Sequence, residues 1–123
     1  MPLLESGENY LESILKLSET KNGVHAIDVV NDLNFSKASV STMLKKLKED
    51  GYITIDNENH LHLTQKGLEI AEKIYERHKV ITDILIKLGV DEKTAEDDAC
   101  KVEHDLTEKS FDAIRKYYEE NIK

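Results

Sequence analysis

The stretch SKASVSTMLKKLKEDGYITIDNENHLHLT, residues 36 to 64, changes its hydrophobic period once and therefore predicts two kinds of structure. After Ser36, apolar residues recur at helical spacing, at Val40, Met43, Leu44 and Leu47. Asp50-Gly51 ends that helix, which we expect over 37–49. YITI and HLHL then alternate with a period of two on either side of a polar turn at 56–59, a pattern typical of a short β-hairpin.

Two further helices are predicted before this stretch. ENYLESILKLSE, residues 8–19, places apolar side chains on one helical face, and Lys21-Asn22-Gly23 ends it. AIDVVNDL, residues 26–33, is a short second helix, and the turn that follows ends at Ser36, which can cap the helix over 37–49. Helices followed by a two-stranded hairpin form the order of a winged helix-turn-helix.

The rest of the chain is predicted to be helical. Thr64 caps a long helix over 65–89, Asp91 caps another that runs to about His104, and Thr107 caps the last one. The fold class is therefore mainly α, with a winged helix-turn-helix subdomain over residues 1–66 followed by a helical subdomain over residues 67–123. We expect the boundary near 63–67.

Composition restricts the classes of function. The chain has 123 residues and one cysteine, which excludes an intramolecular disulfide framework and is compatible with a reducing compartment. No apolar run approaches the roughly 18 residues that span a bilayer, and the start of the chain lacks a signal-peptide pattern. We therefore expect a cytoplasmic protein without a membrane partner.

Charge is unevenly distributed along the chain. The net charge of −8 argues against indiscriminate binding to polyanions. Residues 37–48 nevertheless carry four lysines and no acid, whereas residues 67–123 carry 10 Lys+Arg against 15 Asp+Glu, a net charge of −5. One part of the chain is suited to an anion and the other to cations.

The helix over 37–49 is the candidate DNA-reading helix. In a helix-turn-helix, the second helix enters the major groove with its N-terminal residues nearest the bases, and lysines further along contact phosphates. The alternative is an ordinary amphipathic helix with a solvated lysine face. The predicted DNA-binding residues are Ser36, Lys37, Ser39, Ser41, Thr42, Lys45, Lys46 and Lys48.

DDACKVEHDL, residues 97–106, is the candidate metal-binding stretch. On a continuous helix, Cys100, Glu103 and His104 lie within an arc of roughly 100°. All three are metal-ligand types, although a lone cysteine is more often a small buried hydrophobe. No nucleophile elbow, phosphate-binding glycine loop or catalytic carboxylate pair is present, so we expect neither an enzyme nor an organic small-molecule ligand.

The order of elements, together with DDACKVEHDL in the helix after YERHKVITDIL, resembles the diphtheria-toxin-repressor family of metal-dependent transcriptional regulators. The length is similar to that of its short manganese transport regulators. The resemblance implies a homodimeric repressor that binds a double-stranded DNA operator of metal-uptake genes and uses Fe(II) or Mn(II) as corepressor. It also implies that residues 67–123 bind metal and form the dimer.

The resemblance carries the metal ligands onto specific positions. Cys100 matches the iron branch of the family and Glu12 matches the manganese branch, while Asn9 supplies only a neutral carbonyl oxygen. Thr82 and Glu96 stand where a second site would need Glu and His. Because a thiolate suits softer ions than Mn(II), we expect Fe(II) first, Mn(II) next and Zn(II) as an adventitious occupant. The implied ligands are Asn9, Glu12, His78, Cys100, Glu103 and His104.

A rival hypothesis uses the same cysteine differently. A metal-independent winged-helix regulator could employ Cys100 as a redox switch, since an exposed thiol of low pKa oxidises reversibly. A scaffold of paired acidic helices that does not bind DNA is a weaker alternative, supported only by the net charge.

Overall fold

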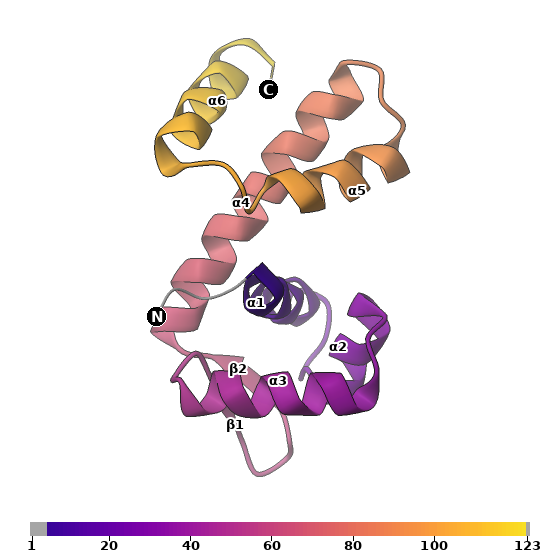
Figure 1. The fold of residues 1–123 in the computed structure, drawn as a ribbon, viewed down its shortest axis with the longest axis vertical. Helices are drawn as coiled ribbons and strands as arrows, with labels where there is room; N and C mark the ends of the chain where they lie inside the picture. Colours follow the sequence, from indigo (N-terminus) through magenta and orange to yellow (C-terminus); the bar gives the residue numbers. More distant parts are fainter. Residues whose placement is uncertain (1–4, 123) are drawn as a thin grey trace. The chain divides into compact units, whose positions relative to one another are not determined.

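The computed structural model describes residues 5–122, and within them it forms six helices and a two-stranded sheet. The ends of the predicted ranges, residues 1–4 and 123, lie outside this description. The chain divides into two compact units, Met1–Lys73 and Ile74–Lys123. No helix in residues 5–122 is long and apolar enough to cross a membrane. In chain order the elements are α1 (Glu5–Ser18), α2 (Ala26–Leu33), α3 (Lys37–Glu49), β1 (Ile53–Ile55), β2 (Leu61–Leu63), α4 (Gln65–Lys87), α5 (Glu92–Val102) and α6 (Glu108–Asn121) (Figure 1).

The first unit is a winged helix-turn-helix, as the hydrophobic periods predict. β1 and β2 pair antiparallel, with Thr54 opposite His62, and the loop before α2 adds a bridge from Val24 to Leu61. Alternation holds in the hairpin, because Ile53 and Leu61 are buried while Thr54 and His62 are exposed. The core of this unit joins α1, α2, α3 and the hairpin, and its fully buried members include Leu11, Ile14, Val29, Val40, Leu47 and Ile53.

The predicted helix caps are confirmed. Ser36 accepts a hydrogen bond from the backbone N–H of Ser39, Asp91 from that of Thr94, and Thr107 from that of Ser110. The Thr64 hydroxyl accepts one from the N–H of Gly67 at 3.2 Å. Each cap satisfies a donor that the first helical turn leaves without a partner.

The second unit contains α4 from Ile74 onward, α5 and α6. Its buried residues include Ile74, Val80, Ile81, Ala95, Ala99 and Phe111. α5 ends at Val102, two residues earlier than predicted, and residues 103–105 form a turn. Glu103 keeps helical backbone angles, and its N–H bonds the oxygen of Ala99, so the helical geometry that starts before Cys100 ends after Glu103.

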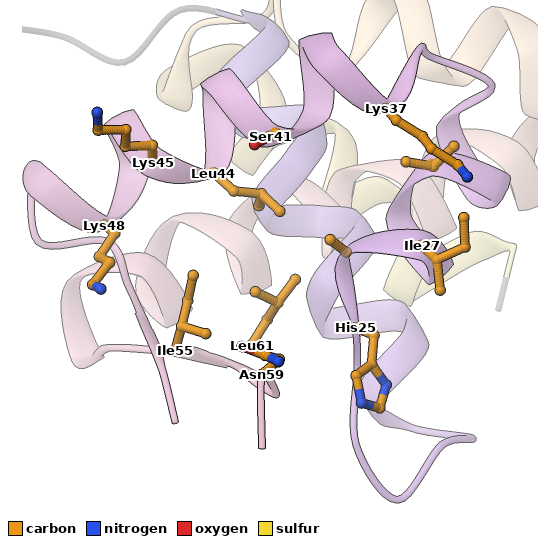
Figure 2. A pocket seen from close by; sticks show the side chains of 12 residues that line it. His25, Ile27, Lys37, Ser41, Leu44, Lys45, Lys48, Ile55, Asn59 and Leu61 are labelled. Carbon is orange, nitrogen blue, oxygen red and sulfur yellow. The ribbon is translucent and has the colours of Figure 1, made fainter. Parts of the chain in front are cut away.

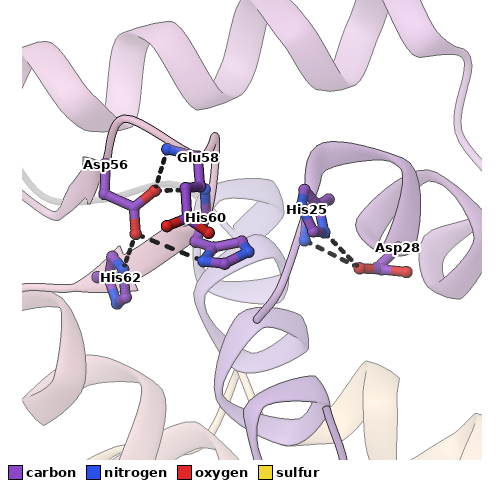
Figure 3. Close-up of polar contacts among 6 residues, drawn as sticks. All are labelled: His25, Asp28, Asp56, Glu58, His60 and His62. Atoms are coloured by element: carbon purple, nitrogen blue, oxygen red, sulfur yellow. Dashed lines mark hydrogen bonds and ion pairs between the residues drawn. The ribbon is translucent and has the colours of Figure 1, made fainter. Parts of the chain in front are cut away.

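Asp56 organises the tip of the hairpin (Figure 3). One carboxylate oxygen accepts hydrogen bonds from the backbone N–H groups of Glu58, at 2.8 Å, and His60, at 3.0 Å. The other lies 2.8 Å from Nε2 of His62. The hydrogen bond with His62, followed by that from the His60 backbone, lowers the pKa of Asp56 to about 2. The Asp56 carboxylate thus has hydrogen-bond partners for both of its oxygens within the hairpin.

The hairpin should therefore loosen only in strong acid. The folded pKa of about 2 lies below the ordinary value of 3.8, so the contribution of Asp56 is complete above about pH 4 and is lost as the pH falls through 2. Carbon NMR of the Asp56 carboxyl should give a midpoint near 2. In Asp56→Asn, the amides of Glu58 and His60 should show no such step. A wild-type midpoint at the ordinary value would contradict this account of the turn.

Gly67 allows α4 to start against the hairpin. A Cβ at this position would overlap the backbone oxygen of Tyr52. Helix propensity alone predicts that Gly67→Ala stabilises the protein by about 1 kcal/mol. We expect the opposite, a loss of about 1–3 kcal/mol in the free energy of unfolding, because backbone must move to admit the methyl group. Urea titration would measure it, with the exposed Glu69→Ala as a near-neutral control; a stabilised Gly67→Ala would show that the contact relaxes freely.

Candidate metal centre and DNA-binding face

α3 presents the predicted DNA-binding residues to solvent. All eight of them are exposed, whereas Val40, Leu44 and Leu47 on the same helix are buried in the core. The helix begins at its cap, where the Ser36 hydroxyl bonds both the backbone N–H and the hydroxyl of Ser39. The first turn therefore carries small polar side chains, with lysines further along the helix.

A groove runs along one flank of α3, between the start of α2 and the hairpin (Figure 2). It has a volume of about 750 Å³. Its floor is apolar, and Lys37, Lys45 and Lys48 of α3 are among its lining residues, none of which is acidic. Lys46 instead lines a second groove on the other flank, with Tyr10, Phe35 and Thr42. α3 thus has cationic side chains on both flanks, in a protein whose net charge is negative.

Glu103 is the centre of the candidate metal site in the second unit. Its side chain is 0% exposed, and His78 Nδ1 on α4 lies 3.0 Å from one carboxylate oxygen. His104 Nε2 lies 3.4 Å from the other oxygen, with 3% of its side chain exposed. A buried carboxylate therefore sits between two imidazoles, of which only that of His78 is partly exposed.

Arg77, which precedes His78 in the stretch that carries the resemblance but was not predicted as a site residue, holds the turn that carries Glu103 and His104. Its Nη1 donates hydrogen bonds to the backbone oxygens of Glu103, at 3.0 Å, and Leu106, at 2.7 Å. Its guanidinium lies 5.2 Å from the ring centre of Phe111. These contacts explain why α5 stops at Val102, since the chain turns toward α4 instead of continuing the helix. No local sequence signal predicts a contact across 26 residues.

The other three predicted ligands come from the end of α5 and from α1. Cys100 is exposed, near the end of α5. No three ligand atoms taken from His78, Cys100, Glu103 and His104 all lie within 4.8 Å of one another. Asn9 and Glu12 belong to α1 in the first unit, where both are half-buried. The structure thus brings together three of the six predicted ligands within one compact unit.

The donor set of the second unit fits a divalent transition ion. A buried carboxylate is costly unless it is paired or coordinates a cation. Imidazole nitrogens and a carboxylate oxygen are ligands for Fe(II), Mn(II) and Zn(II), and the exposed thiol of Cys100 would add a softer donor if its side chain turned inward. The chemistry of these residues therefore suits a metal centre.

Comparisons with known proteins divide the chain in a similar way. Residues 2–61 match the family model described as iron dependent repressor, N-terminal DNA binding domain. Residues 64–121 match the model described as iron dependent repressor, metal binding and dimerisation domain. The two matches together take in nearly the whole chain.

Individual relatives agree with the family models. An uncharacterised HTH-type transcriptional regulator of Methanocaldococcus jannaschii is 37% identical over 117 residues, which cover 94% of each chain. The HTH-type transcriptional regulator MntR of Listeria welshimeri is 34% identical over 109 residues, 89% of this chain and 77% of that one. The solved structure of the manganese regulator SloR matches with a TM-score of 0.81 and 25% identity, covering 92% of this chain but only 53% of that one.

Proposed function

Since the chain belongs to the diphtheria-toxin-repressor family of metal-dependent transcriptional regulators, we propose that it is a homodimeric repressor of metal-uptake genes with Fe(II) or Mn(II) as corepressor. Members of this family are transcriptional regulators and not enzymes, in agreement with the sequence prediction. We assign DNA binding to residues 1–66, and metal binding and dimerisation to residues 67–123.

The observation that carries the proposal is the fully buried carboxylate of Glu103 between His78 and His104. We assign these three residues as ligands, with Cys100, Glu12 and Asn9 completing the set as the family resemblance implies. The family models name iron and the SloR structure names manganese. We favour Fe(II) because Cys100 offers a thiolate, a softer donor than Mn(II) prefers.

Apolar surface in the second unit supports a dimer. A groove of about 530 Å³ is lined by side chains of α4, α5, α6 and the segments that follow them, including Leu88 just after α4 and Tyr117 of α6. These two residues are 75% and 62% exposed. Exposed apolar patches of this kind mark association surfaces, and the family match assigns dimerisation to this part of the chain.

The proposed ligand set would couple metal binding to DNA binding. Asn9 and Glu12 stand on α1, whose Leu11 and Ile14 pack in the same core as Val40 and Leu47 of α3. When bound, the ion supplies positive charge that offsets repulsion among its carboxylate ligands. Ligands on both α1 and the second unit would then fix the spacing of two reading helices, which must match half-sites roughly 34 Å apart. Coupling of this kind is reciprocal and typically amounts to about 1–3 kcal/mol.

The test of the proposed function is DNA binding by anaerobically purified, chelated protein. Fe(II), Mn(II) and Zn(II) are added separately, and operator affinity is measured at fixed salt. We expect weak binding without metal and tighter binding with Fe(II) or Mn(II). The comparisons give no support to the redox alternative with Cys100; DNA binding that ignores chelator but is lost on addition of peroxide would establish it instead.

Lysine substitutions on α3 should act differently from substitutions in its first turn. Lys45→Ala and Lys46→Ala remove charges that we assign to phosphates, so affinity should fall for all sequences alike. The salt slope should decrease by about 1 for each lysine, or about 2 for each substitution in the dimer. Ser39→Ala and Thr42→Ala should alter sequence preference and leave the slope unchanged. Fluorescence anisotropy at several salt concentrations measures both effects. An unchanged slope in the lysine variants would exclude α3 as the helix that contacts DNA.

Cys100→Ala should separate the two candidate metals. It removes the one soft donor and leaves the oxygen and imidazole donors, so Fe(II) affinity should fall much more than Mn(II) affinity. Anaerobic calorimetry with each ion gives the two ratios, and the exposed Lys101→Ala serves as the control from the same helix end. Equal Fe(II) affinity in the wild type and Cys100→Ala would remove this thiol from the site.

A further inference from the structure

We propose that Arg77 is a positioning residue of the metal centre. Its buried guanidinium fixes the backbone of the turn at residues 103–106 and thereby sets the direction in which Glu103 and His104 present their ligand atoms. This inference rests on the proposed metal site and adds a residue that contributes no ligand of its own.

The contacts of Arg77 are confined to the turn and its surroundings. The residue is 4% exposed, and one nitrogen, Nη1, bonds two carbonyl oxygens that belong to Glu103 and Leu106. Helix ends leave carbonyl groups without partners and favour a cation, and hydrogen bonds from a charged donor are stronger than neutral ones. The guanidinium therefore replaces the next turn of α5 as the partner of these carbonyls.

Arg77 and His78 are neighbours on α4, and they hold Glu103 at different points. Arg77 binds its backbone oxygen, and His78 Nδ1 lies 3.0 Å from its carboxylate. If both His78 and Glu103 coordinate an ion, the direct hydrogen bond between them is replaced by bonds to that ion. The hydrogen bonds from Arg77 to the backbone do not depend on this replacement, so Arg77 can maintain the turn with and without the ion.

Stability alone does not explain a charge at this position. Within the described residues, the buried Nε of Arg77 has no hydrogen-bond partner. Burying a guanidinium costs free energy, and replacing buried charged groups by apolar ones is often neutral or stabilising. A role in placing ligands accounts for the charge, because groups that orient metal ligands typically contribute 10- to 100-fold to metal affinity.

Arg115 supplies a matched control. It is also an arginine near Phe111, with its guanidinium 5.9 Å from the ring centre. Its side chain is 38% exposed and pairs with Glu76 and Asp112. Neither of these ion pairs involves the turn at 103–106, so Arg115→Gln removes a guanidinium from the same ring without disturbing the ligands.

The experiment compares Arg77→Gln, Arg77→Lys, Arg115→Gln and Glu103→Gln in the full-length dimer. Affinity for Mn(II) is measured by calorimetry, the ligand geometry by the visible absorption of bound Co(II), and the stability of the metal-free protein by urea titration. Arg77→Gln should lower metal affinity by roughly 10- to 100-fold and change the Co(II) spectrum. The metal affinity of Arg77→Lys should lie between those of Arg77→Gln and the wild type, because lysine keeps the positive charge but places it on a side chain of different length and shape. Arg115→Gln should match the wild type in affinity and spectrum.

The outcomes separate the two proposals. Wild-type affinity and spectrum in Arg77→Gln overturn the positioning role, whatever happens to the stability of the metal-free protein. If Arg77→Gln does not fold, Arg77→Lys decides: reduced affinity with a changed spectrum supports the role, and wild-type values overturn it. If Glu103→Gln retains full affinity, the proposed metal centre itself is wrong. If only Glu103→Gln loses affinity, the centre stands and the inference about Arg77 fails.

Discussion

The buried carboxylate of Glu103 is the constraint on which the second unit depends. A buried carboxylate requires cationic or proton-donating neighbours, and His78 lies at hydrogen-bond distance from one oxygen while His104 lies 3.4 Å from the other. The two imidazoles come from different segments. His78 lies on α4, and His104 lies beside Glu103 in the turn. The negative charge that requires these neighbours also makes the group suitable for binding a dication. The burial of one carboxylate thus accounts both for the imidazoles around it and for the suitability of the group as a metal site.

The first unit meets the opposite requirement, because the side chains that we assign to DNA binding must stay in water. α3 buries three aliphatic residues in the core and leaves its polar face exposed. The core contacts therefore fix the helix while its polar side chains stay accessible to solvent. The negative charge of the whole chain does not prevent this, since electrostatic interactions between exposed charges fade beyond about 8 Å at physiological salt. Local charge along α3, rather than the total, governs what the face attracts.

Local signals in the sequence were sufficient for the helix caps in both units and for the hairpin of the first. Ser36, Asp91 and Thr107 were predicted as caps because their side chains reach only three residues along the chain, and period-two alternation fixed the hairpin. The end of α5 was missed because Arg77 acts from another helix. Glu103 still has helical backbone angles and an N–H bonded to the oxygen of Ala99, so its predicted common face with Cys100 stays a prediction. Family resemblance, rather than spacing, is what connects Cys100, Asn9 and Glu12 with the site, and their role stays a prediction.

The bridge between Val24 and Leu61 has a consequence for how copies of the chain can associate. The Leu61 N–H donates to the Val24 oxygen at 2.7 Å, so β2 is paired on both sides at this point. β1 is only three residues long. Open sheet edges invite strand addition and polymerisation, and short or covered edges suppress both. The wing is thereby protected at this edge from pairing with a strand of another molecule, which leaves self-association to the helical surfaces of the chain.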